Sequence, residues 1–144
     1  MHSKNLVFIS IIPTDEHIAT LFDLLKSRLH KISYGETDFC EHEKFVKEHP
    51  YRCWYLIKIK DTYVGSFYVT KENTIGINIM DECTHLAVSE IIRFVQDNYE
   101  PLPSIQSVRE ERFAINVPPT NKNLNKSLEE IGATIAQITY FIPN

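Results

Sequence analysis

Glycine is scarce in this sequence: the 144 residues contain only four, and none lies between Gly76 and Gly132. Loops that hold phosphate are usually rich in glycine, because a residue without a side chain lets an anion approach the backbone closely. Residues 74–95, "TIGINIMDECTHLAVSEIIRFV", nevertheless have the pattern of a strand followed by a helix. A helix N-terminus at such a junction offers unpaired N–H groups to phosphate. The sequence therefore excludes a glycine-rich loop here but leaves an anion site open.

Cysteines and long apolar runs are also few. The three cysteines, Cys40, Cys53 and Cys83, are odd in number and widely spaced. This pattern indicates neither a disulfide framework nor a CxxC site, and a reducing cytoplasm fits it best. The N-terminal run "LVFISIIP" is too short for a signal peptide. No apolar run approaches the roughly 18 residues that cross a membrane. We therefore expect a cytoplasmic protein with no membrane partner.

Positive charge is not in excess: the formal net charge is −4 with six histidines counted as neutral. A nucleic-acid surface usually shows a basic cluster, so we expect no nucleic-acid partner. A platform that binds single-stranded nucleic acid needs basic residues beside its aromatic side chains, and Lys58, Lys60 and Lys71 are too few for this. Hydrophobic residues at 43% and charged residues at 24% are ordinary for a globular chain. The length predicts a single domain over residues 1–144.

The first third of the chain has the pattern of one strand and two helices. "LVFISIIP" predicts a strand that Pro13 closes. Thr14 or Asp15 is expected to cap a helix, and Asp38 a shorter one that Pro50 ends. One face of the first helix carries apolar residues at helical spacing: Ile18, Leu21, Phe22, Leu25 and Leu29.

The rest of the chain alternates strands with helices. "RCWYLIKIK", "TYVGSFYVTK" and "NTIGINIM" predict three consecutive strands, the first two joined at Asp61-Thr62. A helix to about Tyr99, a strand "RFAINVP", a helix capped by Asn121 and ended by Gly132, and a closing strand "ATIAQITYFI" follow. The fold class is therefore α/β (α+β), a mixed, mostly antiparallel sheet of about six or seven strands flanked by about four helices.

This order of elements resembles the GNAT superfamily of acyl-CoA N-acyltransferases over nearly the whole chain. The segment "FAINVPPTNKNLNKSLEEIGATIAQITYFI" is similar to the superfamily's late strand, asparagine-capped helix, glycine turn and final strand. The centre, "EHEKFVKEHPYRCWYLIKIKDTYVGSFYVTKENTIGINI", is similar to members that acetylate amino sugars. The resemblance implies acetyl-CoA as co-substrate, no metal, and a small-molecule amine as acceptor.

The resemblance also implies where the coenzyme binds. A splayed strand edge pairs with the pantetheine amides, a helix N-terminus holds the pyrophosphate, and a backbone N–H stabilises the thioester oxyanion. Asn121 would contact the pantetheine and Lys122 a phosphate. The bland alternatives are a helix cap for Asn121 and a solvated side chain for Lys122. The residues so implied are Ile77, Asn78, Ile79, Met80, His85, Leu86, Ala87, Val88, Asn116, Asn121 and Lys122.

Two positions depart from the superfamily pattern. Leu86 and Val88 stand where the motif Q/R-x-x-G-x-G/A has glycines, so we expect them to crowd a pyrophosphate. The alternative is a plain helix start with Thr84 as N-cap. Many members place a tyrosine as general acid seven residues after the capping asparagine, but that position is Leu128 here. Tyr140 is the nearest alternative, and packing is the other reading of that residue.

The first two helices wall the acceptor cleft in this superfamily. His30, Tyr34 and His42 are therefore candidate substrate-binding residues, and the alternative for each is an ordinary surface side chain. His42 and His49 share a helical face near Cys40, but a metal site needs three or four convergent ligands, so we expect none. Cys83 lies near a helix start, where the pKa of a thiol falls.

Two functions remain open from the sequence. The first is an acetyl-CoA-dependent N-acetyltransferase in which an amine, for example that of an amino sugar, attacks the thioester directly. The second is a protein that retains the fold without efficient turnover and acts as a binding or interaction module. The order of elements and the Asn121-to-Gly132 segment favour the first, whereas the missing glycines and Leu128 favour the second. A homodimer is compatible with either function, and the sequence does not identify the acceptor.

Overall fold

A single mixed sheet organises the chain. The computed structural model describes residues 6–27 and 38–144. The elements are β1 (Leu6–Ser10), α1 (Asp15–Lys26), α2 (Phe39–Glu48), β2 (Cys53–Ile59), β3 (Thr62–Val69), β4 (Thr74–Ile79), α3 (Asp81–Asn98), β5 (Ala114–Ile115) and α4 (Lys122–Glu130). The sheet order is β1-β2-β3-β4-β5, and only β4 and β5 are parallel. The predicted fold class is confirmed, whereas the described residues form five strands rather than the predicted six or seven.

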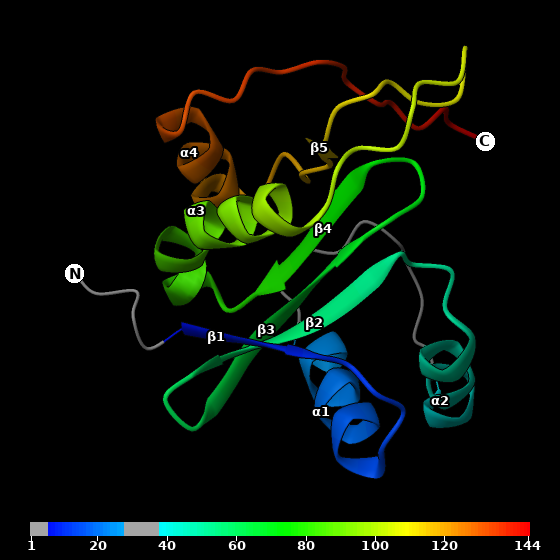
Figure 1. Ribbon diagram of the computed structural model, residues 1–144, viewed down its shortest axis with the longest axis vertical. Coiled ribbons are helices and arrows are strands. Elements are labelled where there is room, and N and C mark those ends of the chain that lie inside the picture. The colour runs from blue at the N-terminus through cyan, green and yellow to red at the C-terminus, as the bar shows by residue number, and fades with distance from the viewer. Residues whose placement is uncertain (1–5, 28–37) are drawn as a thin grey trace.

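Helices cover both faces of the sheet (Figure 1). Helices α1 and α2 lie on one face, and α3 lies on the other with α4 packed beside it. The core under α3 contains Ile57, Val64, Phe67, Val69, Ile75, Ala87, Ile91 and Val95. The core under α1 and α2 is smaller and contains Ile18, Leu21, Val46 and Leu56. The alternation of side chains along each strand supplies both cores from one sheet.

Three helix starts confirm the predicted capping residues. The Thr14 side chain accepts a hydrogen bond from the His17 N–H at 3.2 Å, and Asp38 accepts from the Glu41 N–H at 2.8 Å. The Asn121 side chain accepts from the Leu124 N–H at 3.2 Å. Each side chain satisfies a backbone donor that the first helical turn leaves unpaired.

Helix α3 begins differently from the prediction. Its first residue is Asp81, directly after β4, and Met80 at the N-cap makes no side-chain capping bond. The alternative that placed the N-cap at Thr84 is therefore wrong, and Thr84 is a buried residue of the helix. The strand passes into the helix without an intervening loop.

The predicted closing strand does not form. Gly132 has a φ of +89° and its N–H donates to the Glu129 carbonyl, which confirms the predicted glycine end of α4. Residues 133–144 then run on without a strand partner. Five large side chains of this segment are between 69% and 83% exposed: Ile135, Ile138, Tyr140, Phe141 and Ile142. Their apolar pattern suits a strand, but a strand forms only where a partner supplies the ladder.

The junction between β4 and β5 is held by one buried asparagine. Asn73 precedes β4 with a φ of +66° and is 1% exposed. Its side-chain nitrogen donates to the carbonyls of Leu102 at 2.9 Å and Glu110 at 2.8 Å. Its side-chain oxygen accepts from the Leu102 N–H at 2.8 Å, and its backbone carbonyl accepts from the Ala114 N–H at 3.0 Å. One residue thus fixes both the loop before β5 and the first residue of β5.

The pairing of β4 with β5 stops after two residues. Thr74 lies opposite Ala114, and Ile75 lies opposite Ile115. Pro118 and Pro119 follow shortly afterwards, and proline has no N–H to donate to a ladder. The two strands therefore separate beyond Ile75. Within the described residues, no helix has the length and hydropathy needed to span a membrane.

We expect Asn73→Ala to lower the free energy of unfolding by about 3 kcal/mol or more, because it leaves two carbonyls and one N–H without partners. Asn98→Ala is the matched control, since the exposed Asn98 side chain makes one bond to the Phe94 carbonyl within α3. That variant should stay within about 0.5 kcal/mol of the wild type. Urea unfolding followed by circular dichroism measures both. Similar losses in the two variants would contradict the role given to Asn73.

Candidate active site

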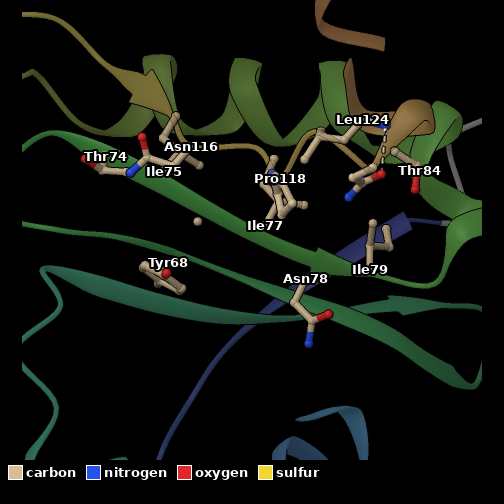
Figure 2. Close-up of a pocket in the computed structure, with 12 residues that line it drawn as sticks. Tyr68, Thr74, Ile75, Ile77, Asn78, Ile79, Thr84, Asn116, Pro118 and Leu124 are labelled. Atoms are coloured by element: carbon tan, nitrogen blue, oxygen red, sulfur yellow. Dashed lines mark hydrogen bonds between the residues drawn. The ribbon is translucent and has the colours of Figure 1, made fainter. Parts of the chain in front are cut away.

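A pocket opens where β4 and β5 separate (Figure 2). It is lined by Tyr68 of β3, by β4, by Thr84 of α3, and by the segment from β5 into α4, which contributes Asn116, Pro118, Asn121 and Leu124. The enclosed volume is about 130 Å³. Pockets that enclose whole drug-sized ligands are usually about 300–1,000 Å³. The pocket therefore fits a narrow arm of a molecule rather than a whole nucleotide.

The edge of β4 presents backbone groups to this pocket. Backbone N–H and C=O groups of a strand alternate between its two edges. The Thr74 carbonyl and the Met80 N–H bond to the β3 side, whereas the Asn73 carbonyl bonds to β5. The odd-numbered residues of β4 therefore face the gap. Ile77 and Ile79 lie beyond the last paired residue, so their N–H and C=O groups are available to a ligand.

The side chains of β4 point to two different sides of the sheet. Ile77 and Ile79 point towards Pro118 and Leu124, on the side of α3 and α4, whereas Asn78 points to the opposite side (Figure 2). Tyr68 lies on the same side as Asn78 and directly opposite Gly76 in the β3–β4 register. A Cβ atom at Gly76 would overlap the Tyr68 ring. The absence of a side chain at Gly76 therefore lets the Tyr68 phenol lie against the strand.

The start of α4 forms the other wall of the pocket. Asn121 lines it and uses its side-chain oxygen for the helix cap. The Asn121 carbonyl also accepts from the Asn125 side chain at 3.0 Å, which stiffens this turn. Asn116 lines the pocket and is exposed, while Lys122 is exposed and does not line it. Asn121 and Asn116 thus stay grouped with β4, as expected from the sequence.

The start of α3 differs from the expected phosphate site. Leu86 and Val88 do not stand at the helix N-terminus, because α3 begins five residues before Leu86. Val88 and its neighbour Ala87 are buried in the core, with 1% and 0% exposure. Leu86 is 38% exposed. The expectation that Leu86 and Val88 crowd a pyrophosphate is therefore wrong. Two carboxylates, Asp81 and Glu82, occupy the first turn instead.

The two carboxylates stabilise the helix but oppose the binding of an anion at its N-terminus. A negative side chain near a helix N-terminus stabilises the helix through its dipole. The same charge repels a pyrophosphate that would use the N–H groups there. His85, 83% exposed in its side chain, lies 3.5 Å from the Glu130 carboxylate and links the start of α3 to the end of α4.

Several predicted site residues lie away from the pocket. The Tyr140 side chain is 79% exposed in the C-terminal segment and does not line the pocket. His42 is 5% exposed between α1 and α2, where its Nε2 lies 2.9 Å from the Ile18 carbonyl. His30 and Tyr34 lie outside the described residues. Sequence reasoning did not single out Tyr68, because cross-strand register is not visible in the sequence.

Cys83 does not line the pocket. Burial raises the pKa of the Cys83 thiol, and the nearby Glu82 charge raises it further. The expectation of a lowered pKa at this helix start is therefore wrong, because burial and the Glu82 charge both disfavour the thiolate. Within residues 6–27 and 38–144, no group of three or more His, Cys, Asp or Glu side chains converges as a metal site.

Glu82→Gln should tighten CoA binding about twofold to fivefold, which corresponds to the roughly 0.3–1 kcal/mol that a charge contributes at a helix N-terminus. Asp97→Asn is the control, since Asp97 lies near the other end of the same helix. It should leave the Kd unchanged. Titration calorimetry at low and high salt measures both, and screening should shrink the effect of Glu82→Gln. Weaker binding by Glu82→Gln would show that the pyrophosphate does not approach α3.

Comparison with known proteins supports the fold. No family model matches the sequence, and no curated protein matches it. Among solved structures, an aminoglycoside acetyltransferase from an uncultured soil metagenomic sample, in complex with sisomicin, is similar at a TM-score of 0.61 and 9% identity. The alignment covers 98% of this chain and 97% of that one.

Two further solved structures are similar to this chain over nearly its whole length. AAC(6')-Iy in complex with a bisubstrate analog of CoA and acetylneamine has a TM-score of 0.61 and 12% identity, over 96% of this chain and 97% of that one. A protein from Clostridium difficile 630 that is described as a possible acetyltransferase has a TM-score of 0.59 and 11% identity, over 96% and 97% of the two chains. This chain therefore has the GNAT fold, at low sequence identity to these structures.

Proposed function

We propose that this protein is an acetyl-CoA-dependent N-acetyltransferase that moves an acetyl group to a small-molecule amine. The observation that carries this proposal is the free edge of β4 in the pocket. Ile77 and Ile79 present backbone groups that no strand pairs with, beside the start of α4. An amide-bearing arm can add to such an edge as a further strand would. The pantetheine arm of acetyl-CoA has this chemistry.

The closed end of the pocket is where the thioester would lie. Ile77 is the first residue of β4 beyond the paired rungs whose N–H faces the gap. That N–H would stabilise negative charge on the thioester oxygen as the amine attacks. Asn116 and Asn121 would contact the arm from the opposite wall. The pantetheine half of the coenzyme thus fits the residues present better than the pyrophosphate half does.

The amine would reach the thioester from the side of α1 and α2, because Thr84 of α3 and Leu124 of α4 wall the pocket on the other side, whereas the described lining includes no residue of α1 or α2. The amine nitrogen attacks the carbonyl carbon, the C–S bond breaks, and no covalent enzyme intermediate is needed. The net charge of −4 favours a cationic acceptor over nucleic acid.

Amino sugars are the acceptor class that we propose to test first. The similarity of the central segment to acetyltransferases of amino sugars supports this choice. It is also supported by neighbours of the same fold, one in complex with sisomicin and one with an acetylneamine analog. The three cysteines, all free thiols, support a reducing, cytoplasmic setting.

A non-catalytic binding module is the second candidate. The carboxylates of Asp81 and Glu82 stand where the coenzyme's pyrophosphate would bind, and Leu128 stands at the position of the usual tyrosine. Both features weaken turnover. This candidate predicts coenzyme binding without acetyl transfer, or neither.

The N-acetyltransferase proposal predicts that CoA raises the unfolding midpoint, because a ligand that binds only the folded state stabilises it. At a concentration of 100 times Kd, the gain is about 2.7 kcal/mol. Acetyl-CoA with glucosamine should release thiol, and glucose should serve as the matched acceptor without an amine. No binding at millimolar CoA would end the proposal, and binding without release for any amino sugar, aminoglycoside or polyamine would favour the second candidate.

We further propose that the chain forms a homodimer through residues 133–144. This segment has no charged residue and exposes five large apolar side chains. Strand β5 ends the sheet with one neighbour, so its outer edge is unpaired. Tyr140 and Phe141 alone offer roughly 300–500 Å² of burial. In the proposed dimer, residues 133–144 of each chain pack against the β5 edge of the other, so two such segments are buried and the area doubles. The isoleucines add further area and bring the total into the range of about 1,200–2,000 Å² found for stable interfaces.

The homodimer proposal predicts a dimer for the wild type and a monomer for Ile138→Lys in size-exclusion chromatography with light scattering. A lysine in the segment places an unpaired charge in the interface. Val108→Lys is the matched control, because Val108 is 59% exposed outside the segment. It should remain dimeric. A monomeric wild type at micromolar concentration, or equal effects of the two lysines, would contradict the proposal.

A further inference from the structure

The thiolate that leaves in the proposed reaction needs a proton. Leu128 stands at the position where the superfamily often has a tyrosine, and it has no proton to donate. Tyr140, the alternative expected from the sequence, is exposed outside the pocket. Among the described residues that line the pocket, Tyr68 is the only one with a titratable side chain.

Tyr68 lies at the closed end of the gap between β4 and β5. In the register of β3 and β4 it is paired with Gly76. Gly76 lies between Ile75, the last paired residue, and Ile77, whose N–H is the first to face the open gap. Neighbouring residues of a strand are about 3.3 Å apart. The Tyr68 ring is thus within one residue of the place where the thioester carbonyl would lie.

The missing side chain at Gly76 brings the hydroxyl end of Tyr68 to this place. The atoms that a Cβ at Gly76 would overlap are Cζ, which carries the hydroxyl, and the two adjacent ring carbons. The Tyr51 ring stacks on the Tyr68 ring, with centroids 3.9 Å apart and planes 7° apart. The ring is therefore held between Tyr51 and the strand, and Figure 2 shows it on the side of the sheet that α1 and α2 cover.

The hydroxyl of Tyr68 also differs from those of neighbouring tyrosines. Tyr55 and Tyr99 share a hydrogen bond of 2.7 Å, and Tyr63 donates to the Glu16 carboxylate at 2.7 Å. Within the part of the chain that the structure describes, the Tyr68 hydroxyl makes no such bond. Its proton is therefore not committed to another of the described groups.

We propose that Tyr68 is the general acid that protonates the leaving thiolate, which rests on the proposed acetyl transfer. The amine nitrogen forms a bond to the carbonyl carbon, and the C–S bond breaks with its electron pair on sulfur. The Tyr68 hydroxyl proton moves to that sulfur and gives free CoA. The phenolate regains a proton from water, which also takes the proton lost by the amine.

Tyr68→Phe tests this role, because it removes the hydroxyl and keeps the ring against Tyr51 and Gly76. We expect kcat to fall by roughly 100-fold or more, the usual contribution of general acid catalysis, with the Kd for CoA unchanged in calorimetry. Tyr63→Phe is the matched control on the same strand, and it should retain full activity. The unfolding midpoints of both variants should equal that of the wild type within a few degrees.

A second measurement separates proton donation from a structural role. An acetyl thioester of an aromatic thiol has a more acidic leaving group, which departs without help from an acid. With this donor, the activities of Tyr68→Phe and the wild type should converge. A comparison of this donor with acetyl-CoA also tests the wild type. The kcat of the wild type should differ little between the two donors, although their leaving thiols differ in pKa, because Tyr68 protonates the sulfur.

The outcomes distinguish this inference from the proposed function. A wild type that neither binds CoA nor releases thiol overturns both. An active wild type with an equally active Tyr68→Phe overturns only the role of Tyr68. A raised KM for the amine with unchanged kcat would make Tyr68 an acceptor-binding residue and would also overturn the role as acid.

Discussion

The arrangement of the pocket depends on the hydrogen bonds of Asn73. This residue bonds through its side chain to two parts of the loop before β5, and through its carbonyl to the first residue of β5. Only two rungs join β4 and β5 beyond it. A parallel pair this short has little stability of its own, so the buried amide fixes the point from which the strands diverge. The free edge of β4 exists because Asn73 fixes one end of this pair, whereas Pro118 and Pro119 have no N–H to continue the ladder at the other end.

The passage from β4 into α3 shows a conflict between stability and anion binding. Without glycine, the chain enters the helix directly at Asp81, and two acidic side chains occupy the first turn. They favour the helix through its dipole, but they place negative charge where the pyrophosphate would approach. In the proposed function, the pantetheine side of the pocket has no such conflict, since backbone groups of Ile77 and Ile79 would bind the arm there. The proposed recognition of the coenzyme thus rests more on the strand than on the helix.

In the proposed reaction, the proton for the leaving thiolate comes from the sheet rather than from a helix. A tyrosine on α4 would approach the thioester from the side of α3 and α4, whereas Tyr68 approaches from the side of α1 and α2. The second position is near the path of the acceptor. It requires a residue without a side chain on the facing strand, and Gly76 meets that requirement. Gly76 is one of only four glycines in the chain.

The sequence alone determined the elements whose signals are local. Thr14, Asp38 and Asn121 cap helices because short polar side chains bond to nearby N–H groups, and alternating apolar residues gave the central strands. Tertiary structure decided what depends on partners. Residues 133–142 have a strand pattern but no partner strand, and α3 begins three residues before the expected cap. Tyr68 meets Gly76 only through the strand register, because neither residue's local sequence says which strand positions face each other.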